Sequence, residues 1–339
     1  MKAIVVDKDY GSVSPEELET VWEAYTQAGM DLECRHFVTE EEILAGCQGA
    51  QVLLATGNPP LSRRVLEGLP KLRWIQRFGI GVNSIDLEAA GERGILVLNL
   101  PGFCARELAD LAAAMILGLI RNTCYYDREI RKGNWPKCQY FLPGNIREMT
   151  LGLYGFGSSA RHLYKIFSGG FGTRVIACDP YLPASIREQY PDVSFVSFER
   201  LVTDSDVISI HVGLTPETRH VFNREVFRKM KNTGMIINTA RGEIIDQKAL
   251  AWALEAGEIR YAGLDTLEQE PVEAGDPLLA LDNVILSPHS GSYGSGSKKT
   301  QLQMVCQLIP QALAGGTLPA RCVANRAYLP GDRLPVELV

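Results

Sequence analysis

The sequence of 339 residues lacks the features that mark membrane, secreted and nucleic-acid-binding proteins. Its longest apolar run, residues 108–120, contains Asp110 and falls short of the ~20 residues that cross a bilayer. Acidic residues (40) outnumber basic ones (34), and the net charge of -6 disfavours binding to nucleic acid or an anionic membrane. Met1 and Lys2 lead directly into a strand-like run, so we expect no signal peptide and a soluble, cytoplasmic protein.

The eight cysteines are scattered, with no C-x-x-C pair and no histidine near them at the spacing of a zinc site. Such cysteines are typical of buried apolar side chains in a reducing compartment, and we expect no metal site. The length suits two domains, because it exceeds what a single hydrophobic core usually serves.

One stretch, residues 151–180, carries the clearest motif; it reads LGLYGFGSSARHLYKIFSGGFGTRVIACDP. The order is strand, glycine turn, helix, strand and acid, which is the pattern of a dinucleotide-binding βαβ unit. Gly155 permits a tight turn, Gly157 lets a pyrophosphate approach the helix N-terminus, and Ala160 is small enough for close packing. Asp179 closes the second strand, where a carboxylate accepts both ribose hydroxyls of NAD. Strand context and this acid disfavour the alternative, a glycine-rich turn of another α/β protein.

Residues 1–100 alternate short strands with short helices, which predicts a parallel sheet covered on both faces. Helix starts are expected at Pro15, which follows the cap-like Ser14, and after Thr39, which precedes three glutamates. The strands are expected at residues 3–7, 32–37, 51–55, 72–76 and 95–98. A loop follows the fourth strand and contains Gly79-Ile80-Gly81, whose backbone N–H groups suit an anion such as a carboxylate. A plain turn at the strand end is an equally open interpretation of that loop.

A break at residues 99–102 precedes an apolar helix, and residues 122–148 are polar and rich in turns. Beyond Asp179, strands are expected at residues 206–211, 234–239, 261–265 and 284–287. Each ends in polar residues: His211, Asn238 to Arg241, Asp265, and Pro288-His289. Because ligands of open α/β sheets bind at the carboxyl ends of strands, we expect these side chains to meet beside Gly155 and Gly157. Taken singly, His211 and His220 are more often structural.

Three blocks of the sequence resemble the D-isomer-specific 2-hydroxyacid dehydrogenases: LGLYGFGSSA, MIINTARGEIIDQKALAWALEAGEIRYAGLDTLEQEP and NVILSPHSG. The resemblance runs from about residue 74 to residue 292. PGFCARELAD and LDTLEQEP are similar to the branch that contains the C-terminal binding proteins. The resemblance implies a Rossmann-type doubly wound parallel sheet for residues 102–289. It also implies a flavodoxin-like α/β substrate domain made of residues 1–101 and 290–339.

The resemblance also implies a catalytic set of Arg241, Glu270 and His289. Arg241 matches the arginine that holds the substrate's carboxylate and carbonyl oxygen, a task for forked N–H donors. His289 matches the acid–base residue, and Glu270 matches the carboxylate that keeps it charged near neutral pH. The backbone of Gly79, Ile80 and Gly81 matches the loop that takes the other side of the substrate carboxylate.

NAD is the expected cofactor rather than NADP, because Asp179 would repel a 2′-phosphate. Asp265 matches the residue that orients the nicotinamide carboxamide. The expected cofactor-binding residues are Gly155, Gly157, Ser158, Ser159, Asp179, His211, Thr215, Thr239, Ala240, Asp265 and His289. The family usually forms homodimers through its nucleotide domains, and closure of the cleft between its domains excludes water.

The expected activity is the interconversion of a small D-2-hydroxy acid and its 2-oxo acid by hydride transfer. Two alternatives stay open: an NADH-sensing binding protein similar to the corepressors of the C-terminal binding protein branch, and a phosphite-type dehydrogenase. Formate oxidation is disfavoured, because formate dehydrogenases of this family carry glutamine where Glu270 stands. The identity of the acid's side chain, the preferred direction and any regulatory role are not encoded in a readable motif.

Overall fold

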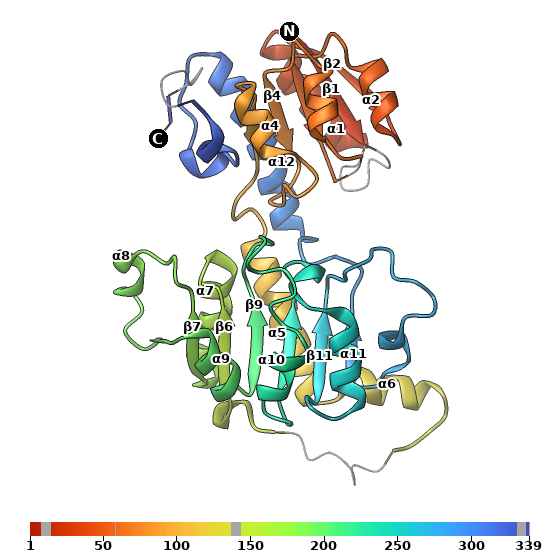
Figure 1. The fold of residues 1–339 in the computed structure, drawn as a ribbon, viewed down its shortest axis with the longest axis vertical. Helices are drawn as coiled ribbons and strands as arrows, with labels where there is room; N and C mark the ends of the chain where they lie inside the picture. Colours follow the sequence, from red (N-terminus) through yellow and green to blue (C-terminus); the bar gives the residue numbers. More distant parts are fainter. Residues whose placement is uncertain (8–14, 58, 137–143, 331–336, 339) are drawn as a thin grey trace. The chain divides into compact units, whose positions relative to one another are not determined.

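The computed structural model describes residues 1–7, 15–57, 59–136, 144–330 and 337–338. Two compact units make up the chain: Met1–Phe103 with Ser295–Val339, and Cys104–Gly294. In Figure 1 the first unit therefore contains both the red and the blue ends of the chain. Ser14, an expected helix cap, and Cys138 lie outside the described residues.

The first unit is built on a parallel sheet of five strands in the order β2-β1-β3-β4-β5, the order of flavodoxin-like folds. Its strands are β1 (Lys2–Asp7), β2 (Asp31–His36), β3 (Val52–Ala55), β4 (Trp74–Arg77) and β5 (Leu96–Leu98). Its helices are α1 (Pro15–Gln27), α2 (Glu40–Gly46), α3 (Arg63–Glu67), α4 (Leu87–Glu92) and α12 (Ser295–Leu313). The five expected strands are all present, close to their expected bounds.

Local sequence signals account for the helix starts of this unit. Pro15 begins α1, as its fixed φ favours at a first helical position. Thr39 caps α2 through a capping box in which its hydroxyl accepts from the Glu42 amide at 3.3 Å. Fully buried aliphatic side chains such as Ile4, Leu53 and Ile75 fill the space between sheet and helices.

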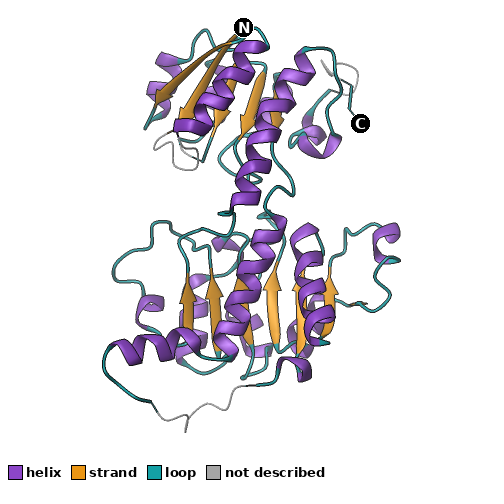
Figure 2. Ribbon diagram, turned by 180° about the vertical axis from the view of Figure 1, so that it is seen from behind, coloured by secondary structure: helices purple, strands orange, loops and turns teal. Residues whose placement is uncertain are grey.

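The second unit contains a parallel sheet of seven strands in the order β12-β11-β10-β9-β6-β7-β8. Numbered from β6, this is the Rossmann order with one added strand. The arrows of this sheet in Figure 2 all point in one direction, as in a parallel sheet. The strands are β6 (Thr150–Tyr154), β7 (Arg174–Cys178), β8 (Ser194–Phe195), β9 (Val207–Ile210), β10 (Met235–Asn238), β11 (Tyr261–Leu264) and β12 (Val284–Leu286). The expected fold class, two parallel α/β sheets with one of Rossmann type, is confirmed.

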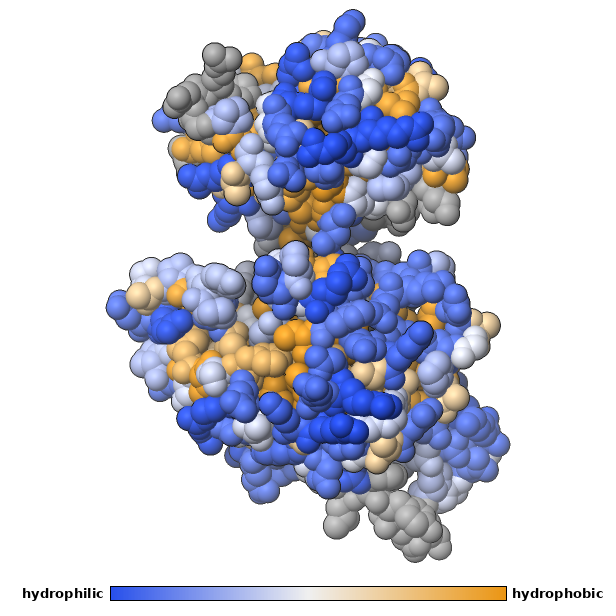
Figure 3. Space-filling view, viewed as in Figure 1, coloured by the Kyte–Doolittle hydropathy of each residue, from blue (hydrophilic) through white to orange (hydrophobic). Residues whose placement is uncertain are grey.

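The helices of this unit cover both faces of the sheet, so its core consists of two clusters, one on each face. They are α5 (Ala105–Ile120), α6 (Thr123–Arg131), α7 (Ser158–Tyr164), α8 (Ala184–Arg187), α9 (Phe198–Asp204), α10 (Arg224–Lys229) and α11 (Gln247–Glu255). Met115, Ile116 and Leu119 of α5 are buried against one face of the sheet. Hydrophilic side chains cover most of the surface in Figure 3, with smaller apolar areas between them.

Two elements of the second unit depart from the expectations. Residues 122–148 contain a helix, α6, although the sequence there indicates turns; none of its residues is buried, and the ion pair Asp127–Arg131 links successive turns. The short edge strand β8 pairs with β7 and has no apolar run to announce it. The helix α6 has no buried residue and β8 spans two residues, so neither leaves a long apolar pattern in the sequence.

Within the described residues, no single helix is long and apolar enough to cross a membrane. The helices α5 and α6 reach the necessary length and apolar composition only when they are taken together, and the chain bends by 65° at the break between them.

Candidate active site

The glycine turn after β6 requires glycine at position 155. Gly155 has φ of 89°, in the left-handed region, and a Cβ there would lie 2.8 Å from the carbonyl oxygen of His211. At Gly157 a Cβ would meet nothing within 4 Å, so the backbone before α7 is open to a ligand. Ala160 is fully buried, and a methyl group is accommodated where the motif often has a third glycine.

These environments predict different outcomes for two alanine substitutions. Gly155→Ala should lower the melting temperature and weaken NADH binding, because strain of roughly 1–3 kcal/mol enters the turn. Gly157→Ala should weaken NADH binding while the melting temperature stays at the parent value, because only the approach of a pyrophosphate is obstructed. Thermal unfolding and NADH fluorescence titration of both variants test this difference. Parent-like NADH affinity of Gly157→Ala would contradict the assignment.

Asp179 links the end of β7 to the glycine turn. Its Oδ2 accepts a hydrogen bond from the Phe156 amide at 2.9 Å, and its Oδ1 accepts from the Tyr181 amide at 3.1 Å. The carboxylate is therefore held in place beside the turn, which fits a ribose hydroxyl acceptor. Arg187 donates to the Asp179 carbonyl oxygen at 3.3 Å and lies over the Phe195 ring.

The two serines at the start of α7 differ in environment. Ser158 is exposed at the helix N-terminus, whereas the Ser159 hydroxyl lies 3.0 Å from Nδ1 of His211. The Nε2 of His211 lies 2.9 Å from the Ser209 hydroxyl, so both ring nitrogens are engaged. Desolvation of the ring lowers the pKa of His211 to about 4, and the residue is neutral at physiological pH. Ser159 and His211 thus bind one another below the turn.

The strand register aligns the ends of four strands in one row. Tyr154 of β6 pairs with Ile210 of β9, Ile210 with Asn238 of β10, and Asn238 with Leu264 of β11. The residues that follow, Gly155, His211, Thr239 and Asp265, leave the sheet at the same edge. Thr239 is buried, while Thr215 is exposed in a loop where its amide donates to the Thr218 hydroxyl at 2.7 Å.

The loop after β10 presents Arg241. The buried Asn238 side chain donates to the Arg241 carbonyl oxygen at 2.8 Å and accepts from the Ala240 amide at 3.0 Å, which fixes the turn. Arg241 Nη1 donates to the Ala240 carbonyl oxygen at 2.5 Å. Burial lowers the pKa of the Arg241 guanidinium, while the charges of Glu243 and Glu270 act in the opposite direction; an arginine stays protonated in any case.

Asp265 holds the loop that carries His289. Its Oδ1 accepts from the Ser287 hydroxyl at 2.6 Å and the Ser290 amide at 2.8 Å, and its Oδ2 accepts from the Gly291 amide at 2.9 Å. His289 has φ of 52°, an uncommon value for a residue with a side chain, and its amide donates to the Asp265 carbonyl oxygen at 2.8 Å. The expected role of Asp265 toward the nicotinamide stays a prediction; the observed contacts give it a positioning role.

Glu270 and His289 form a hydrogen-bonded pair. Nδ1 of His289 lies 2.7 Å from Oε2 of Glu270, and the Leu267 amide donates to Oε1 at 3.0 Å. Burial alone would raise the pKa of Glu270. The hydrogen bonds from His289 and Leu267, with the charges of His289 and Arg241, outweigh burial and bring this pKa below its ordinary value. Glu270 is consequently a carboxylate at neutral pH. Among the residues that the structure describes, none forms a hydrogen bond with Nε2 of His289, and this nitrogen can face a reactant.

Two features fix the segment between Asp265 and Glu270. A Cβ on Gly242 would lie 2.0 Å from the Leu267 backbone, so the Arg241 loop packs directly on this segment. Gln247 and Glu268 exchange hydrogen bonds, with the Glu268 amide 2.9 Å from Oε1 of Gln247, and His220 binds the Glu268 carboxylate. Arg241 and Glu270 are therefore held on adjoining, mutually packed backbone segments.

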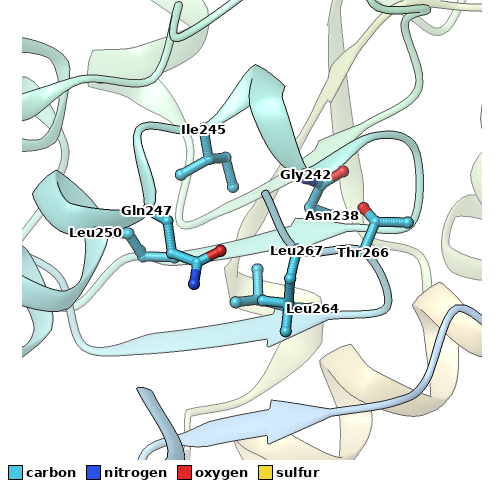
Figure 4. Close-up of a pocket in the computed structure, with 8 residues that line it drawn as sticks. All are labelled: Asn238, Gly242, Ile245, Gln247, Leu250, Leu264, Thr266 and Leu267. Carbon is cyan, nitrogen blue, oxygen red and sulfur yellow. The ribbon is translucent and has the colours of Figure 1, made fainter. Parts of the chain in front are cut away.

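A small hollow lies behind these segments, between the ends of β10 and β11 and the start of α11 (Figure 4). Its lining residues are Asn238, Gly242, Ile245, Gln247, Leu250, Leu264, Thr266 and Leu267. The Thr266 hydroxyl is buried and has no partner within the part of the chain that the structure describes. No residue that titrates near neutral pH lines the hollow, and we assign it no part in the reaction.

The first unit contains Gly79, Ile80 and Gly81, directly after β4. Gly79 and Gly81 are half-buried and the Ile80 side chain is 36% exposed, so this loop lies at the surface of its unit. A Cβ on Gly79 would meet nothing within 4 Å.

Comparison with known proteins adds independent findings. Residues 113–291 match the family model described as D-isomer specific 2-hydroxyacid dehydrogenase, NAD binding domain. The chain belongs to this family. A glyoxylate reductase of Korarchaeum cryptofilum is 34% identical over 288 residues, which cover 84% of this chain and 86% of that protein. A D-3-phosphoglycerate dehydrogenase of Methanocaldococcus jannaschii is 36% identical over 297 residues, 88% of this chain but 56% of that longer protein.

Among solved structures, a glyoxylate reductase from Paecilomyes thermophila superposes with a TM-score of 0.82 at 28% identity, covering 92% of this chain and 95% of that one. The family resemblance, the cofactor NAD and the class of NAD-dependent oxidoreductase expected from the sequence are confirmed. Placement beside the C-terminal binding proteins stays a hypothesis.

Sequence reasoning missed the residues that support the site rather than form it. Ser287, Ser209 and the Leu267 amide hold Asp265, His211 and Glu270. The serines are common residue types at unremarkable spacings, and a backbone amide has no signature in the sequence. Gly242 and Gly291 were the residues in the sequence that could have indicated these supporting contacts. Each lacks a side chain where another segment of the site packs closely, Leu267 on Gly242 and Asp265 on Gly291.

Proposed function

We propose that Arg241, Glu270 and His289 catalyse the NADH-dependent reduction of a small 2-oxo acid to its D-2-hydroxy acid, and the reverse oxidation. The observation that carries this proposal is the 2.7 Å contact between His289 and Glu270 beside the loop of Arg241. A histidine paired with a carboxylate is suited to donate a proton to a carbonyl oxygen and to take it back.

The residues around the glycine turn fit the dinucleotide. The open backbone at Gly157 and the exposed Ser158 suit the pyrophosphate, and the fixed carboxylate of Asp179 suits the ribose hydroxyls of NAD. Arg187 donates to the Asp179 carbonyl oxygen and not to its carboxylate, so the carboxylate keeps the negative charge that would repel a 2′-phosphate. When bound, the reduced cofactor supplies a hydride to the carbonyl carbon of the substrate.

Each catalytic side chain has a separate task. His289, protonated, gives its Nε2 proton to the substrate's carbonyl oxygen as negative charge builds there. Glu270 stabilises the protonated imidazole from the opposite ring nitrogen, and its lowered pKa keeps it ionised for that purpose. Arg241 stabilises the developing charge and binds the substrate carboxylate with its forked donors. In the oxidation direction, neutral His289 accepts the proton.

We assign the amides of Gly79, Ile80 and Gly81 to the substrate carboxylate. Backbone N–H groups of such a loop neutralise an anion without a side chain that must be desolvated. The loop's exposure within the first unit supports this role. Thr215, Thr239, Ala240 and Asp265 remain proposed cofactor contacts on the strength of their place at the strand ends.

A substrate panel tests the proposed function. NADH absorbance is followed with glyoxylate, hydroxypyruvate and pyruvate, and with the ethyl ester of pyruvate as the control that lacks the carboxylate. We expect turnover of at least one acid, little with the ester, and a lower kcat/KM with NADPH. Tight NADH binding without turnover of any acid would instead favour the NADH-sensing protein, and NAD reduction by phosphite would favour the phosphite-type dehydrogenase.

We also propose a homodimer formed through the second unit, and a cytoplasmic location. The helix α6 has no buried residue and Trp135 is 83% exposed, which supports a partner surface in this region. Seven cysteines are free within the described residues, which suits a reducing compartment. Light scattering of the purified chain, with a monomer mass as the contradicting result, tests the dimer.

A further inference from the structure

Five consecutive carbonyl groups, those of residues 77–81, each accept a hydrogen bond from a donor within the first unit, and the donor to the last of them is Arg77 of the same stretch. In order along the loop, the donors are Gln76 Nε2 to Arg77 O (2.9 Å), Gln301 Nε2 to Phe78 O, Leu100 N to Gly79 O (3.0 Å), Asn99 Nδ2 to Ile80 O (2.8 Å) and Arg77 Nε to Gly81 O (2.7 Å). Four of these five donors are side chains, so the arrangement is encoded by residue type and not by regular secondary structure.

The amides of the same loop behave differently. Within the described part of the chain, the N–H groups of Gly79, Ile80 and Gly81 donate to no protein acceptor. In a trans peptide the C=O of one residue and the N–H of the next point in opposite directions. A carbonyl that is held toward the body of the unit therefore turns the following N–H away from it. The five donors therefore fix the orientation of the peptide groups in the loop, with C=O groups turned inward and N–H groups turned outward.

Without these donors, the loop would not hold its peptide groups in this orientation. Gly79 and Gly81 flank Ile80, and glycine permits either orientation of the peptide units next to it at little cost. A reversed peptide would present a carbonyl oxygen, which repels an anion, where an N–H group now stands. A buried peptide carbonyl needs a donor, and the donors here are what distinguish the two orientations.

Gln301 is a polar donor that lies among buried apolar side chains. It lies on α12, is 8% exposed, and shares the buried side of that helix with Val305, Leu308 and Ile309. A polar side chain costs free energy in such a place unless it is hydrogen-bonded. Its amide group binds Phe78 O, 223 residues away in sequence. Asn99 performs the same task for Ile80 O from the end of β5.

We propose that Gln301 and Asn99 are positioning residues for the substrate carboxylate: they turn the carbonyls of the Gly79–Gly81 loop inward and so present its amides to the anion. This inference rests on the proposed function, because it takes that loop to be the carboxylate site. Arg77 strengthens the same arrangement, since its guanidinium bridges Gly81 O and, at 3.1 Å, Ala55 O, and places a positive charge behind the amides.

The test compares Gln301→Met with Gln307→Met, an exposed position on the same helix. Methionine keeps the length of glutamine and removes the donor. We expect the KM for the 2-oxo acid to rise about five- to tenfold in Gln301→Met, the factor that corresponds to one lost hydrogen bond. The kcat should stay within about twofold, because the carboxylate is bound alike before and during reaction, and the Kd for NADH should not change. Gln307→Met should match the parent.

Asn99→Ala provides a second, independent variant and decides the matter if Gln301→Met does not fold. A folded variant whose KM equals that of the parent, or whose only change is a lower melting temperature, would overturn the positioning role. That result would leave the proposed function intact, since the parent still turns over. A parent protein that reduces no 2-oxo acid would overturn both.

Discussion

Replacement of Arg241 by alanine should lower kcat/KM for 2-oxo acid reduction on the order of a thousandfold. Loss of one preorganised donor to a developing oxyanion typically costs about 10²- to 10³-fold in kcat, and here the substrate carboxylate loses a charge partner as well. Both kcat and KM should therefore worsen. Asn238 and Ala240 hold the loop through backbone and amide contacts, so the substitution should leave the turn itself in place.

Arg241→Lys distinguishes charge from geometry. An ammonium restores the positive charge but cannot donate in a fork, so we expect recovery of only part of the lost activity. Arg219→Ala is the matched control, because Arg219 is a nearby exposed cation paired with Glu243 at 3.7 Å. Steady-state kinetics with NADH and the preferred acid measure all three variants. A lysine variant with the full activity of the parent would contradict the role given to Arg241.

The pH dependence of the reaction should change sharply when Glu270 is replaced by glutamine. In the parent, Glu270 stays ionised down to acidic pH because its pKa is lowered, and it stabilises the protonated form of His289. Reduction should hold at low and neutral pH and fall once His289 loses its proton, while oxidation rises over the same interval. Without the carboxylate, the protonated imidazole loses the charge partner that stabilises it, so both limbs of the rate profile should move to lower pH.

Measurement of kcat/KM against pH in both directions tests this prediction. Glu273→Gln is the control, because it removes an exposed carboxylate three residues away from Glu270. His289→Ala should flatten both profiles at a very low rate, since no group of suitable basicity remains. Limbs that stay in place in Glu270→Gln would mean that another charge governs His289, and the pairing would lose its mechanistic role.

The sequence allows the position in the fold to be predicted for those candidate site residues that follow a strand. Gly155, Asp179, Arg241 and His289 each follow a short apolar run, and parallel strands bring such positions to one edge of a sheet. Periodicity and capping signals, such as Thr39 before three glutamates, likewise place most elements of both sheets. These features are local, so they survive in a single sequence.

The remainder depends on contacts between distant residues. Gln301 reaches Phe78 across 223 positions, and nothing in the composition of α12 indicates that one of its glutamines is buried. Asp265 illustrates the same point: its motif suggests a ligand contact, whereas its carboxylate accepts three hydrogen bonds from residues 287–291. Positioning contacts of this kind follow from tertiary packing, which a single sequence does not disclose.

We propose that His289, paired with Glu270, transfers the proton in an NADH-dependent reduction. The most direct measurement is the rate of NADH oxidation by the parent and by His289→Ala, at saturating NADH and with the best acid of the panel. NADH affinity is titrated in both proteins to show that the cofactor still binds. We expect turnover by the parent and a loss of about a thousandfold or more in kcat in the variant, with unchanged NADH affinity. A His289→Ala variant that keeps the parent's kcat would contradict it.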